Sequence, residues 1–265
     1  MAYAARVVLD SVSEAGIRLI TLEVTFPRFV LAEFNTHRSF SRNSASSRAV
    51  PTSKTIERVE DDPVTPIEWG RNRKGMSASE QLLQREREEA ERAWLDARDA
   101  AVGQAQKLHH LGVHKQVANR LLEPFLWHTA IVTATEWENF FSLRCSANAQ
   151  PELREAAIRM REAIGASVPA AVGTGAWHLP LVQPDERALA LEVRKKISVA
   201  RCARVSYLTH EGTRVIEKDL ELYERLRGDR HLSPFEHVAT PAADAAFHAN
   251  LRGWMQMRAE IESTP

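Results

Sequence analysis

The sequence predicts an α+β fold built as a single domain over residues 1–265. Residues 17–26 alternate between apolar and polar side chains, which is typical of a half-buried strand. Several longer segments instead repeat apolar residues at the spacing of an amphipathic helix. A chain of 265 residues, 44% hydrophobic and 26% charged, is also long enough to close one sizeable core.

The predicted strand leads into a polar cluster. Pro27 ends the alternation, and the apolar residues that follow predict a short helix over residues 29–34. This helix is expected to deliver His37 and its neighbours from a sheet edge. Residues 60–76, with two prolines and two glycines, are expected to form an exposed excursion or lid.

Helical patterns dominate the rest of the chain. Ser77 and Glu80 have the spacing of a capping box, so a long amphipathic helix is expected to run from Ser77 to about residue 108, before Gly112. Further helices are predicted over residues 114–122, 136–149, 151–164, 191–205 and 217–226. The glycine-rich residues 171–176 lack the spacing of a dinucleotide or phosphate loop and predict an ordinary loop, and residues 233–237 predict a compact turn.

Charge and cysteine content exclude several classes of function. Lys+Arg and Asp+Glu both number 35, so no net field draws the chain to nucleic acid or to an anionic membrane. No segment has the apolar length of a membrane span, and the N-terminal residues lack a secretory core, so we expect a cytoplasmic protein. Cys145 and Cys202 are too few for a disulfide framework and are expected to be free thiols.

The densest group of polar residues spans positions 35–48. It contains one histidine, three arginines and five serines. Guanidinium and hydroxyl donors of this kind suit phosphate oxygens or the electron-rich edge of a cofactor. The alternative is a basic, serine-rich surface loop.

Four segments together resemble the flavin-dependent thymidylate synthase family. Thr36-His37-Arg38 with Ser46 and Arg48 resembles its R-H-R-x7-S motif, with threonine in place of the first arginine. Three further segments resemble its N-F-L-x-L-R…A-Q, R-A-A-R-V-S-F and T-P-F-E-H motifs: residues 139–150, 201–207 and 233–237. In the family the last two precede R-H-R, so their position here implies a circular permutation, which is tolerated when the parental termini lie close together.

The resemblance implies an α+β fold of long helices packed on a mixed sheet, with permuted connectivity. It implies FAD as cofactor, methylenetetrahydrofolate and NADPH as co-substrates, and a pyrimidine deoxynucleotide monophosphate as substrate, most simply dUMP converted to dTMP. It also implies a homotetramer, with no membrane and no stable nucleic-acid partner.

The resemblance assigns roles residue by residue. Arg144 and Ser46 fall at catalytic positions. Substrate-binding positions are occupied by Glu33, Ser46, Ser47, Arg48, Arg120 and Arg144. Cofactor-binding positions are occupied by His37, Arg38, Asn43, Asn139, Ser206 and His237. His37 and Arg38 are expected to supply positive charge to the reduced flavin. The alternatives are a surface histidine at position 37, an ion pair of Arg144 with Glu138, and structural roles for Asn139, Ser206 and His237.

The chain also departs from the family pattern. Thr133 and Thr135 replace an asparagine and an arginine associated with FAD, and Ser44 replaces a glutamate. The phosphate-contacting arginine aligns with Asn119, next to Arg120.

Glu33 stands where the family has a glutamine that touches the nucleotide. An ionised carboxylate only accepts hydrogen bonds, and cytosine offers an amino donor, so a deoxycytidylate substrate or a hydroxymethyl product is the alternative function.

Two other classes stay open. His109, His110 and His114 lie at helical spacings, but no nearby acid completes a metal site. The basic residues 71–74 suggest a non-catalytic nucleic-acid-binding module. Neither cysteine has the basic surroundings of a nucleophile, so hydride from flavin, not thiol addition, is the implied route.

Overall fold

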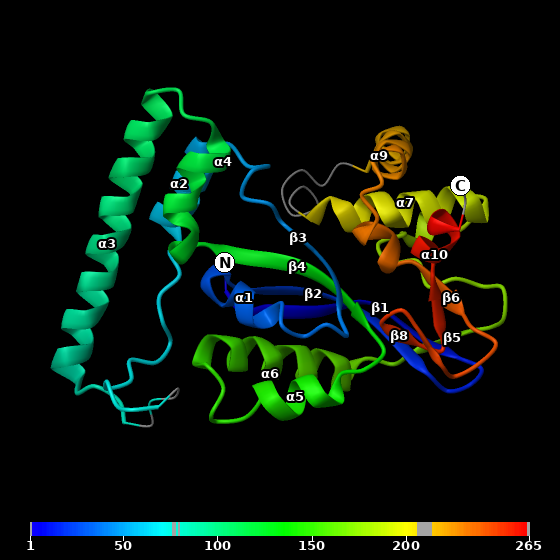
Figure 1. Ribbon diagram of the computed structural model, residues 1–265, viewed down its shortest axis with the longest axis horizontal. Helices are drawn as coiled ribbons and strands as arrows, with labels where there is room; N and C mark the ends of the chain where they lie inside the picture. Colours follow the sequence, from blue (N-terminus) through cyan, green and yellow to red (C-terminus); the bar gives the residue numbers. More distant parts are fainter. Residues whose placement is uncertain (1, 76–77, 79, 206–213, 264–265) are drawn as a thin grey trace.

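A mixed five-stranded sheet forms the centre of the molecule (Figure 1). The computed structural model describes residues 2–75, 78, 80–205 and 214–263. The strand order is β3-β4-β2-β1-β5, and all neighbours are antiparallel except the parallel pair β1 and β5. The strands are β1 (Ala4–Ser13), β2 (Arg18–Pro27), β3 (Ser41–Ser44), β4 (Trp127–Ala134) and β5 (Ala170–Val172).

The remaining elements surround this sheet. The helices are η1 (Arg28–Val30), α1 (Leu31–Phe34), α2 (Thr52–Asp61), α3 (Gln84–His110), α4 (Lys115–Ala118), η2 (Asn119–Phe125), α5 (Glu138–Arg144), α6 (Pro151–Ala166), η3 (Pro184–Glu186), α7 (Leu191–Ala203), α9 (Ile216–Gly228), η4 (Ser233–Glu236) and α10 (Met257–Glu262). Two small two-stranded ladders pair β6 (Ala239–Pro241) with β9 (Trp254–Gln256) and β7 (Phe247–His248) with β8 (Leu251–Arg252).

The two faces of the sheet have different covers. The apolar residues of β2 pack with α5 and α6 into the largest core cluster, in which Leu22, Phe26, Leu153 and Met160 are all fully buried. The opposite face is covered by α7, η4 and the C-terminal segments. Burial on both faces puts even Thr21, on the polar side of β2, at 0% exposure.

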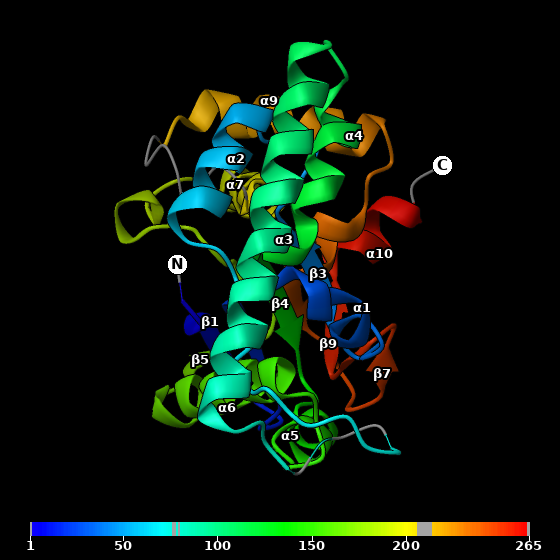
Figure 2. The ribbon, with the colours of Figure 1, turned by 90° about the vertical axis from the view of Figure 1, so that its left-hand side faces the viewer.

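The longest helix stands beside the sheet. α3 packs on α2, α4 and η2 through residues that include Val102 and Ala105 (Figure 2). The expected α+β class is therefore confirmed, but the expectation that the long helices pack on the sheet is wrong for α3. No helix in the described residues is long and apolar enough to cross a membrane.

Several predicted elements agree with the structure. The strand at 17–26 is β2, and the helices at 151–164, 191–205 and 217–226 are α6, α7 and α9. The helix expected at 136–149 is shorter, because α5 ends at Arg144. The glycine-rich loop begins with the short strand β5. The segment at 60–76 is not wholly exposed, since Val64 is buried and its carbonyl accepts a hydrogen bond from Trp94.

The predicted start of the long helix is wrong. α3 begins at Gln84, seven residues after Ser77, and the carboxylate of Glu86 accepts the backbone N–H of Leu83. Glu80 instead pairs with arginines of the preceding segment. Ser77 lies outside the described residues.

Candidate functional site

The edge strand β3 brings together three segments that are far apart in the sequence. Both η4 and α7 pack against β3, so residues 41–46, 201–204 and 233–237 lie side by side. They line a cavity of about 970 Å³, here called the basic cavity, with Asn43, Ser46 and Arg204 in its wall. The volume is in the range of small-molecule and cofactor sites.

The basic cavity has an excess of positive charge. Its lining contains seven basic side chains and one acidic one: Arg6, Arg42, Arg201, Arg204, Arg214, Lys218, Arg225 and Asp219. Four of the arginines form ion pairs with acidic side chains. In the described part of the chain, Arg42, Lys218 and Arg225 have no such partner. The cavity is therefore suited to an anionic ligand.

Arg201 is a structural member of this group. Its guanidinium is 2% exposed and donates to Asp219 Oδ2 (2.9 Å), to both oxygens of Glu186 (2.7 and 2.6 Å) and to the carbonyl of Leu181 (2.9 Å). These bonds lower the pKa of Glu186 and fix α7 to α9 and η3. Arg204, which pairs with Asp219 alone, is the more accessible arginine.

His37 and Arg144 meet although 107 residues separate them. Arg144 Nε donates to His37 Nε2 at 2.8 Å, so the imidazole is neutral and carries its hydrogen on Nδ1. Burial, with the charges of Arg144 and Arg42, lowers the pKa of His37 to about 4. The ring packs edge-on against Phe140, with centroids 4.8 Å apart.

This contact excludes two of the alternatives and corrects one expectation. His37 is 8% exposed and is not a surface histidine. It does not supply positive charge near neutral pH, because burial first, and then the charges of Arg144 and Arg42, lower its pKa to about 4. Arg144 does not pair with Glu138; its Nε donates to His37, and its Nη2 donates to the hydroxyl of Thr36 at 3.5 Å.

A chain of buried hydrogen bonds crosses the sheet behind the basic cavity. His237 Nε2 lies 3.4 Å from Asn43 Oδ1, and His237 Nδ1 lies 2.7 Å from Thr133 Oγ1. Thr133 Oγ1 contacts Thr21 Oγ1 at 2.7 Å, and Thr21 contacts His178 Nε2 at 2.8 Å. The chain ends where His178 Nδ1 meets Ser11 Oγ at 2.8 Å.

The direction of every bond in this chain follows from its end at Asn43. An amide oxygen only accepts, so His237 donates from Nε2 and accepts at Nδ1 from Thr133. Thr133 then accepts from Thr21, Thr21 accepts from His178 Nε2, and His178 accepts from Ser11. Both histidines are neutral, because burial lowers the pKa of each to about 3. Asn43 Nδ2 makes no hydrogen bond in the described residues and is left for the cavity.

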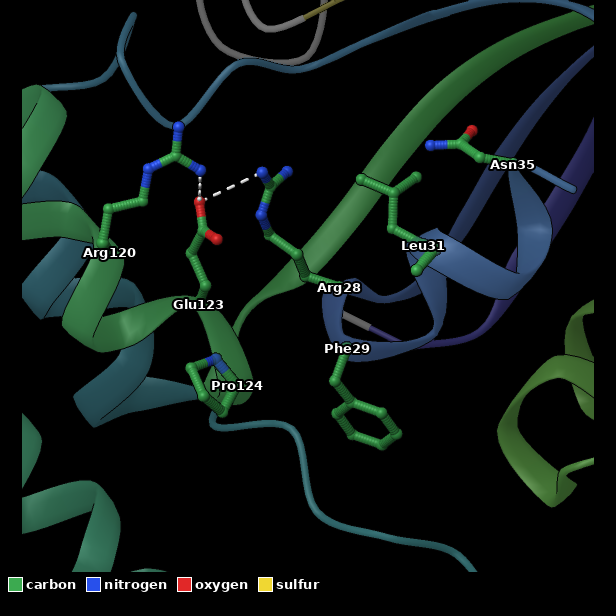
Figure 3. A pocket seen from close by; sticks show the side chains of 8 residues that line it. Arg28, Phe29, Leu31, Asn35, Arg120, Glu123 and Pro124 are labelled. Atoms are coloured by element: carbon green, nitrogen blue, oxygen red, sulfur yellow. Dashed lines mark hydrogen bonds and ion pairs between the residues drawn. The ribbon is translucent and has the colours of Figure 1, made fainter. Parts of the chain in front are cut away.

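A second pocket, of about 480 Å³, lies between η1, α1 and η2 (Figure 3). Glu123 Oε1 forms an ion pair with Arg28 (3.0 Å) and accepts hydrogen bonds from Arg120 (2.8 Å) and Ser47 Oγ (2.9 Å). Asn119 is fully buried and donates Nδ2 to the carbonyls of Ser47 (2.7 Å) and Val50 (3.0 Å). Asn119 thus positions the loop after β3, while its neighbour Arg120 lines the pocket.

Other predicted site residues lie away from these contacts. Arg48 and Asn139 are exposed, and Arg48 has no ion-pair partner in the described residues. Arg38 lines a separate pocket beside Glu236. Ser206 lies outside the described residues. One carboxylate oxygen of Glu33, Oε2, is buried without a hydrogen-bond partner.

The described residues contain no arrangement suited to a nucleophilic cysteine or to a bound metal ion. Both cysteines are free thiols, and burial raises the pKa of Cys202 and of Cys145. Within the described residues, no group of three or more His, Cys, Asp and Glu side chains is placed to hold a metal ion. His114 instead caps α4, since its Nδ1 accepts the backbone N–H of Gln116.

Comparison with known proteins gives one family and one related fold. The family model of the thymidylate synthase complementing protein matches residues 12–170. Two crystal structures of a UMP/dUMP methylase PolB from Streptomyces cacaoi resemble the chain, each at 17% identity over 62% of this chain. The complex with 5-Br UMP has a TM-score of 0.50 over 89% of its chain, and the complex with 5-Br dUMP has 0.48 over 90%. No curated protein matches the sequence.

Proposed function

Because the chain belongs to the thymidylate synthase complementing protein family, and is thus an enzyme of the thymidylate synthase-like methyltransferase class, we propose the following reaction. It transfers a one-carbon unit from methylenetetrahydrofolate to C5 of a pyrimidine deoxynucleotide monophosphate, most simply dUMP to dTMP. FAD is the cofactor, NADPH is the reductant, and the active protein is a homotetramer. The family match covers more than half of the chain.

The observation that carries this proposal is the meeting of three motif-like segments around the basic cavity. Residues 201–204 and 233–237 lie beyond the family match yet pack against β3, which follows His37. A permuted order of the same segments requires this contact in space. The likeness of the UMP/dUMP methylase supports the fold alone.

The donor set of the basic cavity fits a flavin dinucleotide. Arg42, Lys218 and Arg225, which have no ion-pair partner among the described residues, are cations suited to phosphate oxygens, and Asn43 Nδ2 is a donor suited to a carbonyl of the flavin ring. When bound, FAD supplies the hydride of the reaction. The protein's own contribution is to bind, orient and exclude water.

Arg144 is the residue proposed to act on the pyrimidine. His37 fixes its Nε, and the long 3.5 Å bond of Nη2 to Thr36 still leaves donors on the terminal nitrogens for a carbonyl or a phosphate. Such a fixed cation stabilises negative charge that develops on the ring as C5 is attacked. His37 is then a positioning residue for Arg144. Ser46, in the wall of the basic cavity, is proposed to bind the nucleotide.

The structure also favours the second candidate function at one point. The buried Oε2 of Glu33 has no partner, and no ion pair occupies this carboxylate in the described residues. An unsatisfied acceptor matches the amino group of cytosine better than the carbonyl of uracil. A dCMP methylase or hydroxymethylase is therefore the alternative.

Product analysis tests both candidates. The purified protein is incubated with methylenetetrahydrofolate, NADPH and either dUMP or dCMP, and the products are identified by mass spectrometry. We expect a yellow protein with flavin absorbance and a nucleotide carrying one added carbon. Glu33→Gln should shift the preference toward dUMP if Glu33 reads the base. A colourless protein that shifts DNA and modifies neither nucleotide would overturn the enzymatic proposal.

A further inference from the structure

Side chains from three separate segments converge on one oxygen atom of Glu123, which lines the smaller pocket; Figure 3 draws two of them, Arg28 and Arg120. Arg28 of η1 forms an ion pair with Glu123 Oε1 at 3.0 Å, and Arg120 of η2 and Ser47 of the loop after β3 donate hydrogen bonds to the same oxygen at 2.8 and 2.9 Å. Two guanidinium groups and a hydroxyl around a single oxygen are the donor set that proteins use for phosphate. Here that set surrounds a carboxylate of the chain itself.

The carboxylate does not saturate these donors. Two arginines face one glutamate, so a positive charge is left over. The remaining neighbour of Arg28 is His128, whose Nδ1 lies 3.0 Å from the guanidinium; burial and Arg28 lower its pKa to about 3, so it adds no charge. Among the residues that the structure describes, Arg28 Nε is buried without a hydrogen-bond partner. The group therefore has donors and charge in reserve for a larger anion.

The donors are held in place from behind. Asn119 donates to the carbonyls of Ser47 and Val50 and so holds the loop that carries the Ser47 hydroxyl. The side chain of Arg28 is only 16% exposed, whereas those of Glu123 and Arg120 are 22% and 54% exposed and border the open pocket. Glu123 is thus able to turn into the pocket while Arg28 and Ser47 stay where they are.

We propose that Arg28, Arg120 and Ser47 form a subsite for a phosphate monoester, and that Glu123 occupies this subsite as an internal competing anion. The inference rests on the proposed function in one respect, namely that the phosphate belongs to the pyrimidine nucleotide. Binding of the phosphate releases the Glu123 carboxylate to solvent. When no nucleotide is present, the carboxylate keeps the two arginines paired. An anion of low charge does not bind tightly enough to displace it.

Removal of the competing charge distinguishes this role from a purely structural one. Glu123→Gln keeps an oxygen acceptor for the arginines but no longer repels phosphate. We expect its affinity for dUMP and for inorganic phosphate to rise about tenfold, which corresponds to about 1.4 kcal/mol. Affinity for deoxyuridine, which has no phosphate, should not change. Arg28→Met should weaken dUMP and phosphate binding at least about tenfold.

Isothermal titration of the full-length protein with dUMP, inorganic phosphate and deoxyuridine provides the measurement. Glu136→Gln is the matched control, because Glu136 also pairs with an arginine, Arg252 at 2.6 Å, but lies outside the pocket. If Glu123→Gln does not fold, Arg120→Gln carries the test, since its side chain is half exposed; a fivefold or greater loss of phosphate affinity is expected.

Two results would overturn the proposal. One is unchanged or weaker phosphate binding in Glu123→Gln, which would make Glu123 an organiser of the arginines. The other is failure of the wild-type protein to bind any phosphate compound at millimolar concentration. Failure of the proposed function is a separate outcome: a protein without flavin or turnover would still show the effect of Glu123→Gln on phosphate.

Discussion

Replacing Thr133 by valine would interrupt the buried hydrogen-bond chain at its middle. The substitution keeps the shape of the side chain but removes a hydroxyl that accepts from Thr21 and donates to His237, each at 2.7 Å. The hydroxyl hydrogen of Thr21 and the Nδ1 lone pair of His237 then have no partner, in a region where both residues are fully buried.

The size of the loss follows from these two groups. An unsatisfied buried polar group costs about 1–3 kcal/mol, and the new methyl group recovers some apolar contact. We therefore expect Thr133→Val to lower the free energy of unfolding by about 3 kcal/mol, or about 6–12 °C in Tm for a chain of this size. Thr133→Ser, which keeps the hydroxyl, should recover most of the loss.

The assay is urea unfolding at pH 7.5 followed by circular dichroism. Thr25→Val is the matched control, because Thr25 pairs with Thr129 at 3.0 Å between the same two strands but contacts no histidine. Its cost should stay below about 1 kcal/mol. If Thr133→Val costs no more than Thr25→Val, the hydrogen-bond chain does not stabilise the fold as its geometry implies.

Three further predictions concern the buried charges, the histidines and the proposed active site. Arg201→Met should destabilise the protein by about 3–5 kcal/mol, because it removes the closest cation from two buried carboxylates and leaves Glu186 with the 3.8 Å contact to Arg214 and Asp219 with the pair to Arg204. Arg204→Met should cost less than half of that; urea unfolding compares the two, and equal losses would contradict the structural role of Arg201. Four buried histidines have lowered pKa values, namely His37, His128, His178 and His237. Unfolding allows each to bind a proton below its ordinary pKa of about 6.5, so stability should be constant above that pH and fall toward pH 4 and 3, by up to about 1.4 kcal/mol per pH unit for each histidine; a flat profile from pH 7 to 5 would refute this. Arg144→Gln should reduce kcat/KM at least about 100-fold while changing Tm by only a few degrees, and a large loss of Tm with normal turnover in the folded fraction would exclude the proposed catalytic role.

Local sequence patterns predicted the elements whose apolar residues lie at a regular spacing on one face. β2 has apolar residues at every second position on the side that meets α6, and Pro27 marks its end. Pro151 at the first turn of α6 likewise marks a helix start. In these segments the apolar residues that meet the largest core cluster recur at a regular spacing along the sequence.

Strands without that period were missed. β4 is buried along nearly its whole length between β3 and β2, and its polar residues His128, Thr129 and Thr133 are buried as well, so its sequence shows no regular alternation. The register of β1 shifts between Val7 and Leu9, which breaks its period of two. β3 contains no apolar residue and forms a strand only because β4 offers a paired edge.

The candidate site was predicted in part, because only some of its residues lie in segments with a recognisable motif. Motif-like segments indicated His37, Asn43, Ser46, Arg144 and His237, and the structure places all five beside the basic cavity or at the His37–Arg144 contact. Arg28, Glu123 and His178 stand alone in the sequence, so no local pattern marks them. Thr21 looked like a solvent-facing residue because the segments that cover it come from the C-terminal third of the chain.

The hydrogens of the buried chain behind Asn43 have only two consistent arrangements. Each hydroxyl and each neutral imidazole has one hydrogen to give, so turning the amide of Asn43 by half a rotation would reverse every bond as far as Ser11. A ligand atom that prefers the amide oxygen to the amide nitrogen would thereby change the tautomer of His178, on the far side of β2. The hydrogen-bond directions within the sheet would then depend on which ligand atom is bound, although no strand moves.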